Sequence, residues 1–149
     1  MREVADELRA EVAEAVRRLQ TIPDIAASEP RAEGKWSRTE ILGHLVDSAF
    51  NNEHRFVRAQ LTSDLSFPGY EQDEWVARQG YRDRAWAEVI DTWRAANQHL
   101  AHTIERVPET ARAHIVRIGD DPHDPPATLE WWVRDYLRHL RHHLSQILE

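Results

Sequence analysis

The chain has 149 residues, a formal net charge of −7 and no cysteine. Its length and its 41% apolar content suit one domain over residues 1–149 with a sizeable core. The acidic charge argues against a nucleic-acid partner, and the lack of Cys excludes disulfides, thiolate ligands and a thiol nucleophile carried by the protein.

Apolar residues that recur with helical period mark the first two helices. Residues 2–20 form the first predicted helix, and Pro23 ends it before a loop over residues 21–36. A capping box made of Ser37 and Glu40 starts a second helix, expected over residues 37–61. The two apolar stripes are Val4, Leu8, Val12, Ala15, Val16 and Leu19 in the first helix, and Leu42, Leu45, Val46, Ala49, Phe56 and Val57 in the second.

A polar stripe follows the other side of the second predicted helix. It consists of His44, Asp47, Ser48, Asn51 and Arg55. The apolar residues opposite already supply a core-facing side, so periodicity alone favours a face turned to solvent.

A long connector and a third helix occupy the middle of the chain. Residues 62–82 form the connector, with a short helical piece expected at 71–79 around Trp75. This segment is long for a bundle connection, and it either covers one end of the bundle as a lid or packs as a fixed connector. Asp83 is a good N-cap for a helix over residues 83–106, whose stripe is Trp86, Ile90, Trp93, Leu100 and Ile104.

The last predicted helix, over residues 128–148, contains three of the nine histidines. A connector over residues 108–127 precedes it, with a weak strand pattern at 114–118, and we expect His114 and His123 in this connector to be exposed. Thr128 caps the helix, whose apolar stripe is Leu129, Val133, Tyr136, Leu140, Leu144 and Ile147.

Four amphipathic helices, without repeats and without a convincing sheet, predict an all-α fold. The expected architecture is a four-helix bundle with a long connector between the second and third helices. Because that connector is long, the helices need not follow a simple up-and-down order.

His139 and His143 lie one turn apart on a flank of the last helix, whereas His142 turns toward the arginines on its outer side. Such a pair can bind one divalent metal if a third ligand comes from elsewhere, and in this chain that ligand must be His, Asp or Glu. Most pairs at this spacing bind nothing, so the spacing alone leaves a purely structural role open.

Three segments of the chain resemble one known family. They are 35-KWSRTEILGHLVDSAFNNEHRFVRAQL-61, 70-YEQDEWVARQGY-81 and 136-YLRHLRHHLSQI-147. Together they resemble the DinB-like superfamily of damage-inducible bacterial proteins, and most closely its branch of metal-dependent hydrolases. The resemblance covers nearly the whole chain in the same order, and it implies a DinB-like four-helix bundle.

The resemblance also implies a metal site of three histidines, one in an HLxD-like run on the second helix and two in an HxxxH run on the last. Residue by residue, these are His44, in 44-HLVD-47, with His139 and His143. Members of the family usually bind a divalent transition metal, Zn or Ni first and Mn or Fe as alternatives. On this interpretation His44 faces inward, and the polar residues that share its stripe line the site: Asp47, Ser48, Asn51 and Arg55.

Three imidazoles leave at least one metal position open, where a bound water or a bound thiol becomes a nucleophile at neutral pH. The first case gives hydrolysis and the second gives thiol S-transfer, and the sequence does not separate them.

Asp47 and Arg55 are the candidate catalytic residues. Asp47, like Asp135, would orient an imidazole or move a proton, unless it forms a surface ion pair. Arg55 would bind a substrate carboxylate, unless it is a solvated arginine. Tyr70 and Trp75 either wall the pocket or belong to the core.

The expected function is therefore a divalent-metal-dependent enzyme, a hydrolase or thiol transferase acting on a small molecule. Its partners would be that substrate, a low-molecular-weight thiol in the transferase case, and a second copy of the chain as a homodimer. The alternative is a non-catalytic metal-binding or structural bundle. A Ser/His/Asp hydrolase is disfavoured, because the sequence has no GxSxG run.

With no apolar signal segment and no run near the ~18 apolar residues of a membrane span, we expect a cytoplasmic protein without a membrane partner. Six histidines are expected not to bind metal: His54, His99, His102, His114, His123 and His142.

Overall fold

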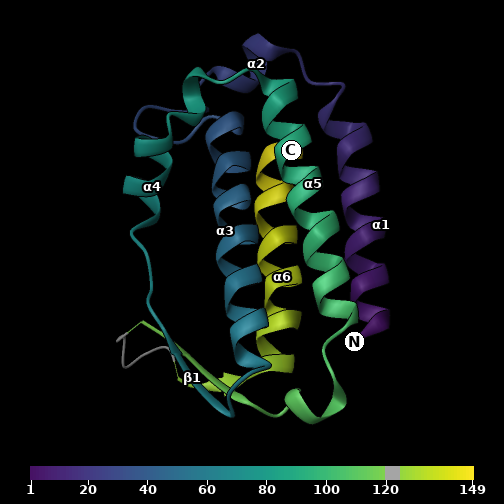
Figure 1. The fold of residues 1–149 in the computed structure, drawn as a ribbon. Helices are drawn as coiled ribbons and strands as arrows, with labels where there is room; N and C mark the ends of the chain where they lie inside the picture. Colours follow the sequence, from purple (N-terminus) through teal and green to yellow (C-terminus); the bar gives the residue numbers. More distant parts are fainter. Residues whose placement is uncertain (120–124) are drawn as a thin grey trace.

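The computed structural model describes residues 1–119 and 125–149, and its main feature is a bundle of four long helices (Figure 1). These are α1 (Arg2–Leu19), α3 (Arg38–Ala59), α5 (Trp86–Glu105) and α6 (Leu129–Leu148). The predicted four-helix bundle is confirmed. Both predicted helix starts with side-chain caps are present, because Ser37 and Glu40 form the capping box of α3 and Thr128 accepts a hydrogen bond from the Trp131 backbone N–H.

The helices do not alternate in direction along the chain. In Figure 1, α1 and α6 run toward the same end of the bundle, whereas α3 and α5 both run the opposite way. The chain must therefore return along the bundle between α3 and α5, a distance of ~33 Å for the 22 residues of α3. This return explains the long connector, which contains β1 (Asp64–Phe67) and α4 (Gln72–Gln79) and runs alongside α3.

A small sheet closes the end of the bundle where α6 begins. β1 pairs in parallel with β2 (Ile115–Ile118), and β2 pairs antiparallel with β3 (Ala127–Thr128). The weak strand pattern at 114–118 is thus confirmed as β2, which follows a short 3₁₀ turn, η2 (Glu109–Ala111). The sequence did not predict the sheet, because its three strands are short and come from two different connectors.

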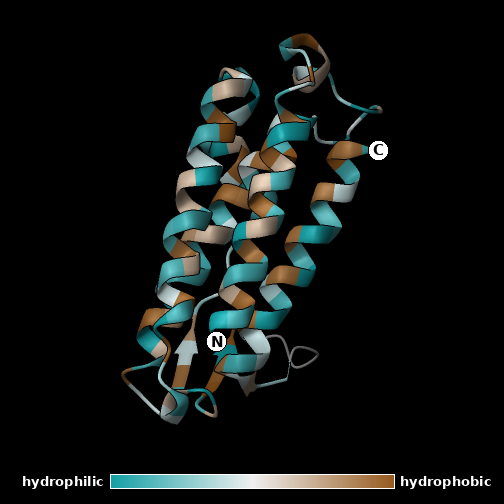
Figure 2. Cartoon of the chain, turned by 90° about the vertical axis from the view of Figure 1, so that its right-hand side faces the viewer, coloured by the Kyte–Doolittle hydropathy of each residue, from teal (hydrophilic) through white to brown (hydrophobic). Residues whose placement is uncertain are grey.

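The apolar stripes of the four helices meet in one core, and hydrophilic and hydrophobic bands alternate along the helices (Figure 2). Every stripe residue expected in α1, α5 and α6 is buried. In α3 the expectation fails at Val57, whose side chain is 40% exposed. The buried side of α3 is shifted toward its polar stripe, so His44, Asp47, Ser48 and Arg55 are buried and the predicted solvated face is wrong.

The connector is fastened to α3 by Tyr81, in a single 3₁₀ turn, η1 (Tyr81–Asp83). Its ring packs where α3 has Gly43, since a Cβ there would lie 2.2 Å from Tyr81 Cγ. Its hydroxyl donates to Asp47 Oδ1 at 2.7 Å, and the Gln79 side-chain amide donates to the same oxygen. Gly43 and Asp47, one turn apart, therefore hold the connector in place before α5 begins.

Two predicted boundaries are wrong. Asp83 ends η1 instead of capping a helix, and Arg84 leaves in an extended conformation, so α5 starts at Trp86. We attribute the later start of α5 to the packing of Tyr81 on α3, because the chain must leave the η1 turn before a helix can begin. The expected loop over residues 21–36 contains a short helix, α2 (Asp24–Ser28). No helix among the described residues is long and apolar enough to cross a membrane.

Candidate metal centre

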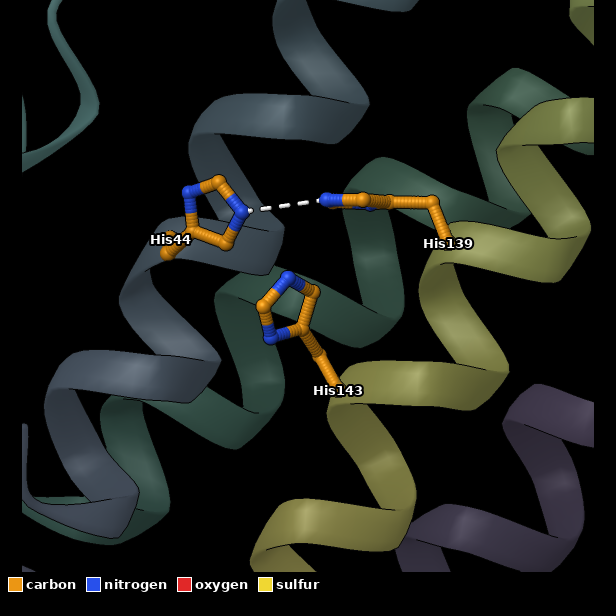
Figure 3. Close-up of side chains that lie close together, drawn as sticks. All are labelled: His44, His139 and His143. Atoms are coloured by element: carbon orange, nitrogen blue, oxygen red, sulfur yellow. Dashed lines mark hydrogen bonds between the residues drawn. The ribbon is translucent and has the colours of Figure 1, made fainter.

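Three histidines from two helices converge at one point in the bundle (Figure 3). His44 on α3 is fully buried, and His139 and His143 on α6 are half-buried. The Nε2 atoms of His44 and His139 lie 3.2 Å apart, and one ring nitrogen from each histidine lies within 4.8 Å of the other two. The structure thus brings together the three side chains that the sequence analysis selected.

The arrangement fits a divalent transition metal. A tetrahedral ion with imidazole ligands at ~2.0–2.1 Å places the ligand nitrogens about 3.3 Å from one another. The His44 and His139 nitrogens are already near that separation, and the ring of His143 is centred 4.8 Å from His44 and 4.5 Å from His139. Small side-chain rotations would complete three bonds and leave the fourth position for another ligand.

Burial keeps the three imidazoles neutral. It lowers the pKa of His44 to about 3, and the charges of His139 and His143 add to the effect. It also lowers the pKa of His139 to about 4, with further repulsion from His143, His142 and Arg55. The pKa of His143 falls mainly through burial. Since a metal binds the neutral imidazole, these side chains are ready as ligands at neutral pH.

The three rings differ in what holds them. The half-buried Trp36 packs against His44, with ring centroids 5.4 Å apart. Nδ1 of His143 lies 2.9 Å from Oε1 of Gln146. Within the described part of the chain, the buried Nδ1 atoms of His44 and His139 have no hydrogen-bond partner.

The cluster borders a cavity of about 1320 Å³ between α3, α6 and the connector. His139 lies in its wall, together with Ser48, Asn52 and Arg55 of α3. Tyr70 and Trp75 contact each other, with ring centroids 4.8 Å apart and ring planes tilted by 48°. They form part of the wall from the connector side, so they line the cavity and are not core residues. Other aromatic residues complete the lining: Phe67, Trp132 and Tyr136. The cavity has room for a small molecule beside the histidines.

Arg55 is a buried cation in this wall. Its side chain is 8% exposed, its guanidinium lies 5.3 Å from the centre of the Phe67 ring, and it donates to Asn52 Oδ1 at 3.5 Å. Its charge helps to lower the pKa of His139, so it acts on the cluster at short range. The interpretation as a solvated arginine is therefore wrong, and its role toward a substrate stays a prediction.

The two candidate aspartates differ in their contacts. Asp47 is buried against Tyr81 and Gln79, and burial raises the pKa of its carboxyl despite these hydrogen bonds. These contacts account for Asp47 as the anchor of the connector, and its catalytic role stays a prediction. Asp135 pairs with Arg138, which is the ion pair expected as the alternative, and it also lines the cavity. Its role toward an imidazole or a proton stays a prediction.

The other histidines that the structure describes lie outside the cluster. His54, His99, His102 and His142 are exposed. His114 is half-buried and not exposed as expected, because its Nδ1 lies 2.7 Å from the carbonyl oxygen of Ala59. The expectation for His123 lies outside the described residues.

The sequence analysis missed Asn52, a residue of α3 in the cavity wall. Asn52 lines the cavity, whereas the expected Asn51 donates to the carbonyl oxygen of Asp47 in its own helix. Helical spacing held the signal, because His44, Ser48, Asn52 and Arg55 follow one another at intervals of three or four residues. Selecting the residues that share a helical face with His44, instead of every polar residue on that side of the helix, would have found Asn52.

The fold and the site define a helical bundle in which three histidines from two helices form a candidate metal centre beside a cavity. The chain belongs to the DinB superfamily, whose family model matches residues 5–147. The recognised family and its fold are thereby confirmed. Among curated proteins, none matches the sequence.

Solved structures with the same fold are similar to this chain in architecture more than in sequence. YfiT from Bacillus subtilis, described as a probable metal-dependent hydrolase with an unusual four-helix bundle topology, matches with a TM-score of 0.77 and 18% identity, over 98% of this chain and 81% of YfiT. Two structures of the mycothiol-dependent maleylpyruvate isomerase match with a TM-score of 0.74, at 14% and 15% identity. The match covers 97% of this chain but only 59% of the isomerase.

Alanine substitution of each histidine should separate the ligands from the others. We expect His44→Ala, His139→Ala and His143→Ala to lose most of the stabilisation that Zn²⁺ or Ni²⁺ adds to the folded protein, because metal binding stabilises only the folded state. Melting temperatures across a metal titration measure this effect. The alanine variants of His54, His99, His102, His114 and His123 are the controls. Stoichiometric binding by His44→Ala would reject the three-histidine site.

Acid should destabilise the metal-free protein through the same histidines. Unfolded His titrates near ~6.5, above the folded pKa values of about 3 and 4, so only the unfolded chain binds these protons as the pH falls from 7 to 5. The free energy of unfolding should fall by about 1–2 kcal/mol for each buried imidazole over that window. Urea denaturation of chelator-treated protein measures it. His44→Gln should flatten the pH dependence and the exposed-site control His54→Gln should not. Equal slopes in both variants would contradict the assignment.

Proposed function

We propose that this protein is a divalent-metal-dependent enzyme acting on a small molecule, with Zn or Ni as the first metals to test and Mn or Fe next. The observation that carries the proposal is the position of His139, which belongs to the three-histidine cluster and also lies in the wall of the large cavity. A metal held by this cluster would therefore face the space in which a substrate binds. A structural metal site is normally closed by four protein ligands, whereas the described residues offer three here.

Two reactions suit such a site. A bound metal would lower the pKa of a water or of a thiol in its open position, which gives hydrolysis in the first case and thiol S-transfer in the second. A thiol would have to come from a small molecule, since the chain has no cysteine. Similarity in fold to a probable metal-dependent hydrolase and to a mycothiol-dependent isomerase supports testing both reactions.

The residues around the histidines would bind and orient the substrate. Arg55 would bind an anionic group such as a carboxylate, because a buried guanidinium forms strong charge-assisted hydrogen bonds. Ser48 and Asn52, between Arg55 and His44 on the same face of α3, offer hydrogen bonds to a polar substrate. The aromatic side chains of the wall would contact an apolar part and keep water from it.

Metal dependence of turnover tests the proposal. We expect untagged protein to be inactive after chelation and to recover turnover when reloaded with Zn²⁺ or Ni²⁺. The assays would be a panel of esters and amides, and a panel of electrophiles with low-molecular-weight thiols. His139→Ala should behave like the chelated protein, while His99→Ala, an exposed histidine, should keep full activity. Identical behaviour of loaded and chelated protein across both panels would favour a non-catalytic metal-binding bundle.

Arg55→Gln tests the anion subsite separately. The loss of a hydrogen bond to a charged group costs about 1.5–3 kcal/mol, so KM for an anionic substrate should rise about 10- to 150-fold. The metal content and KM for a neutral analogue should stay near those of the unchanged protein. If KM for the anionic and neutral substrates rises equally, Arg55 supports the cavity without binding the anionic group.

A further inference from the structure

The ring of His143 is held by the side-chain amide of Gln146, which has a hydrogen-bond acceptor, its oxygen, and a donor, its nitrogen. The Gln146 side chain lies between two neighbouring histidines of α6. Its Oε1 is 2.9 Å from Nδ1 of His143, and its Nε2 is 3.0 Å from Nε2 of His142. The three residues form one chain of contacts from the surface, where His142 is exposed, to the metal centre.

These contacts determine where the proton of His143 sits. A carboxamide oxygen only accepts hydrogen bonds and a carboxamide nitrogen only donates them. Nδ1 of His143 must therefore donate to Gln146, while Nε2 of His142 accepts from it. A neutral imidazole carries one proton, so Nε2 of His143 is left with a free lone pair. In Figure 3 that nitrogen points toward His44 and His139.

The opposite orientation of the amide would not suit a metal. The amide nitrogen would then donate to Nδ1 of His143 and force the ring proton onto Nε2, the atom that faces the other two histidines. His142 completes this chain of contacts, because its Nε2 lies 3.0 Å from the amide nitrogen and accepts from it when the oxygen faces His143. Nδ1 of His44 and of His139 has no such partner in the described chain, so this control is specific to His143.

We propose that Gln146 is a positioning residue of the metal centre, which keeps the His143 proton on Nδ1 and presents Nε2 as a ligand. This inference rests on the proposed metal site and adds the group that prepares one of its ligands. Metal-binding histidines characteristically donate their second ring N–H to such an acceptor, and loss of the acceptor weakens metal binding about 10- to 100-fold.

Three variants test the role by metal affinity. Gln146→Leu keeps the bulk of the side chain and removes the acceptor, so the Kd for Co²⁺, followed by its visible absorption in competition with a chelator, should rise about 10- to 100-fold. Gln146→Glu retains an acceptor oxygen and should bind Co²⁺ much more tightly than the Leu variant. His142→Ala, which only removes the support of the amide, should have a smaller effect than Gln146→Leu. The melting temperature of the metal-free Gln146→Leu protein should match that of the unchanged protein, since Gln146 is only half-buried.

A second measurement does not involve metal. Long-range ¹H–¹⁵N spectra of the metal-free protein should show His143 protonated at Nδ1, and Gln146→Leu should shift it toward protonation at Nε2. Normal Co²⁺ affinity in Gln146→Leu, with His143→Ala impaired, would overturn the role of Gln146 and leave the metal centre intact. Normal affinity in both variants, or no Co²⁺ binding by the unchanged protein, would overturn the metal centre and this inference with it.

Discussion

The candidate site depends on the burial of three imidazoles at one point between α3 and α6. Burial is the main cause of the low pKa values of all three histidines, and therefore of their neutral form at neutral pH. It also has a cost, because Nδ1 of His44 and of His139 lies buried without a partner in the described chain, and unsatisfied buried polar atoms oppose folding. The apolar helices offset this cost, and a metal that binds only the folded protein would stabilise it further.

The direction of the helices provides the cavity beside these histidines. Because α3 and α5 run the same way, the intervening chain has to travel back along the bundle, and it does so beside α3. This return path places Tyr70 and Trp75 opposite the polar face of α3 and creates the wall of the cavity. Gly43 and Asp47 fasten its far end through Tyr81, so the residues that hold the connector lie on the helix that carries His44.

The family relationship accounts for the architecture and leaves the reaction to the site. At 18% identity or less, YfiT and the maleylpyruvate isomerase share the fold with this chain, which shows that quite different sequences specify the same bundle. Function depends on the groups placed on that bundle. Here they are three neutral imidazoles, a buried Arg55 in the adjoining wall and Gln146 behind His143.

The sequence by itself determined the local features of this protein. Helical period predicted the four long helices, capping chemistry located the starts of α3 and α6, and the spacing of His139 and His143 placed both on one face. It did not orient His44, because the polar stripe of α3 has the pattern of a solvated face and only the family resemblance turned it inward. Tertiary structure decided the start of α5, the sheet, and the pairing of Gln146 with His142 and His143. Each of these depends on contacts between segments distant in sequence, or on the rotamers of neighbouring side chains, and periodicity carries no information about either.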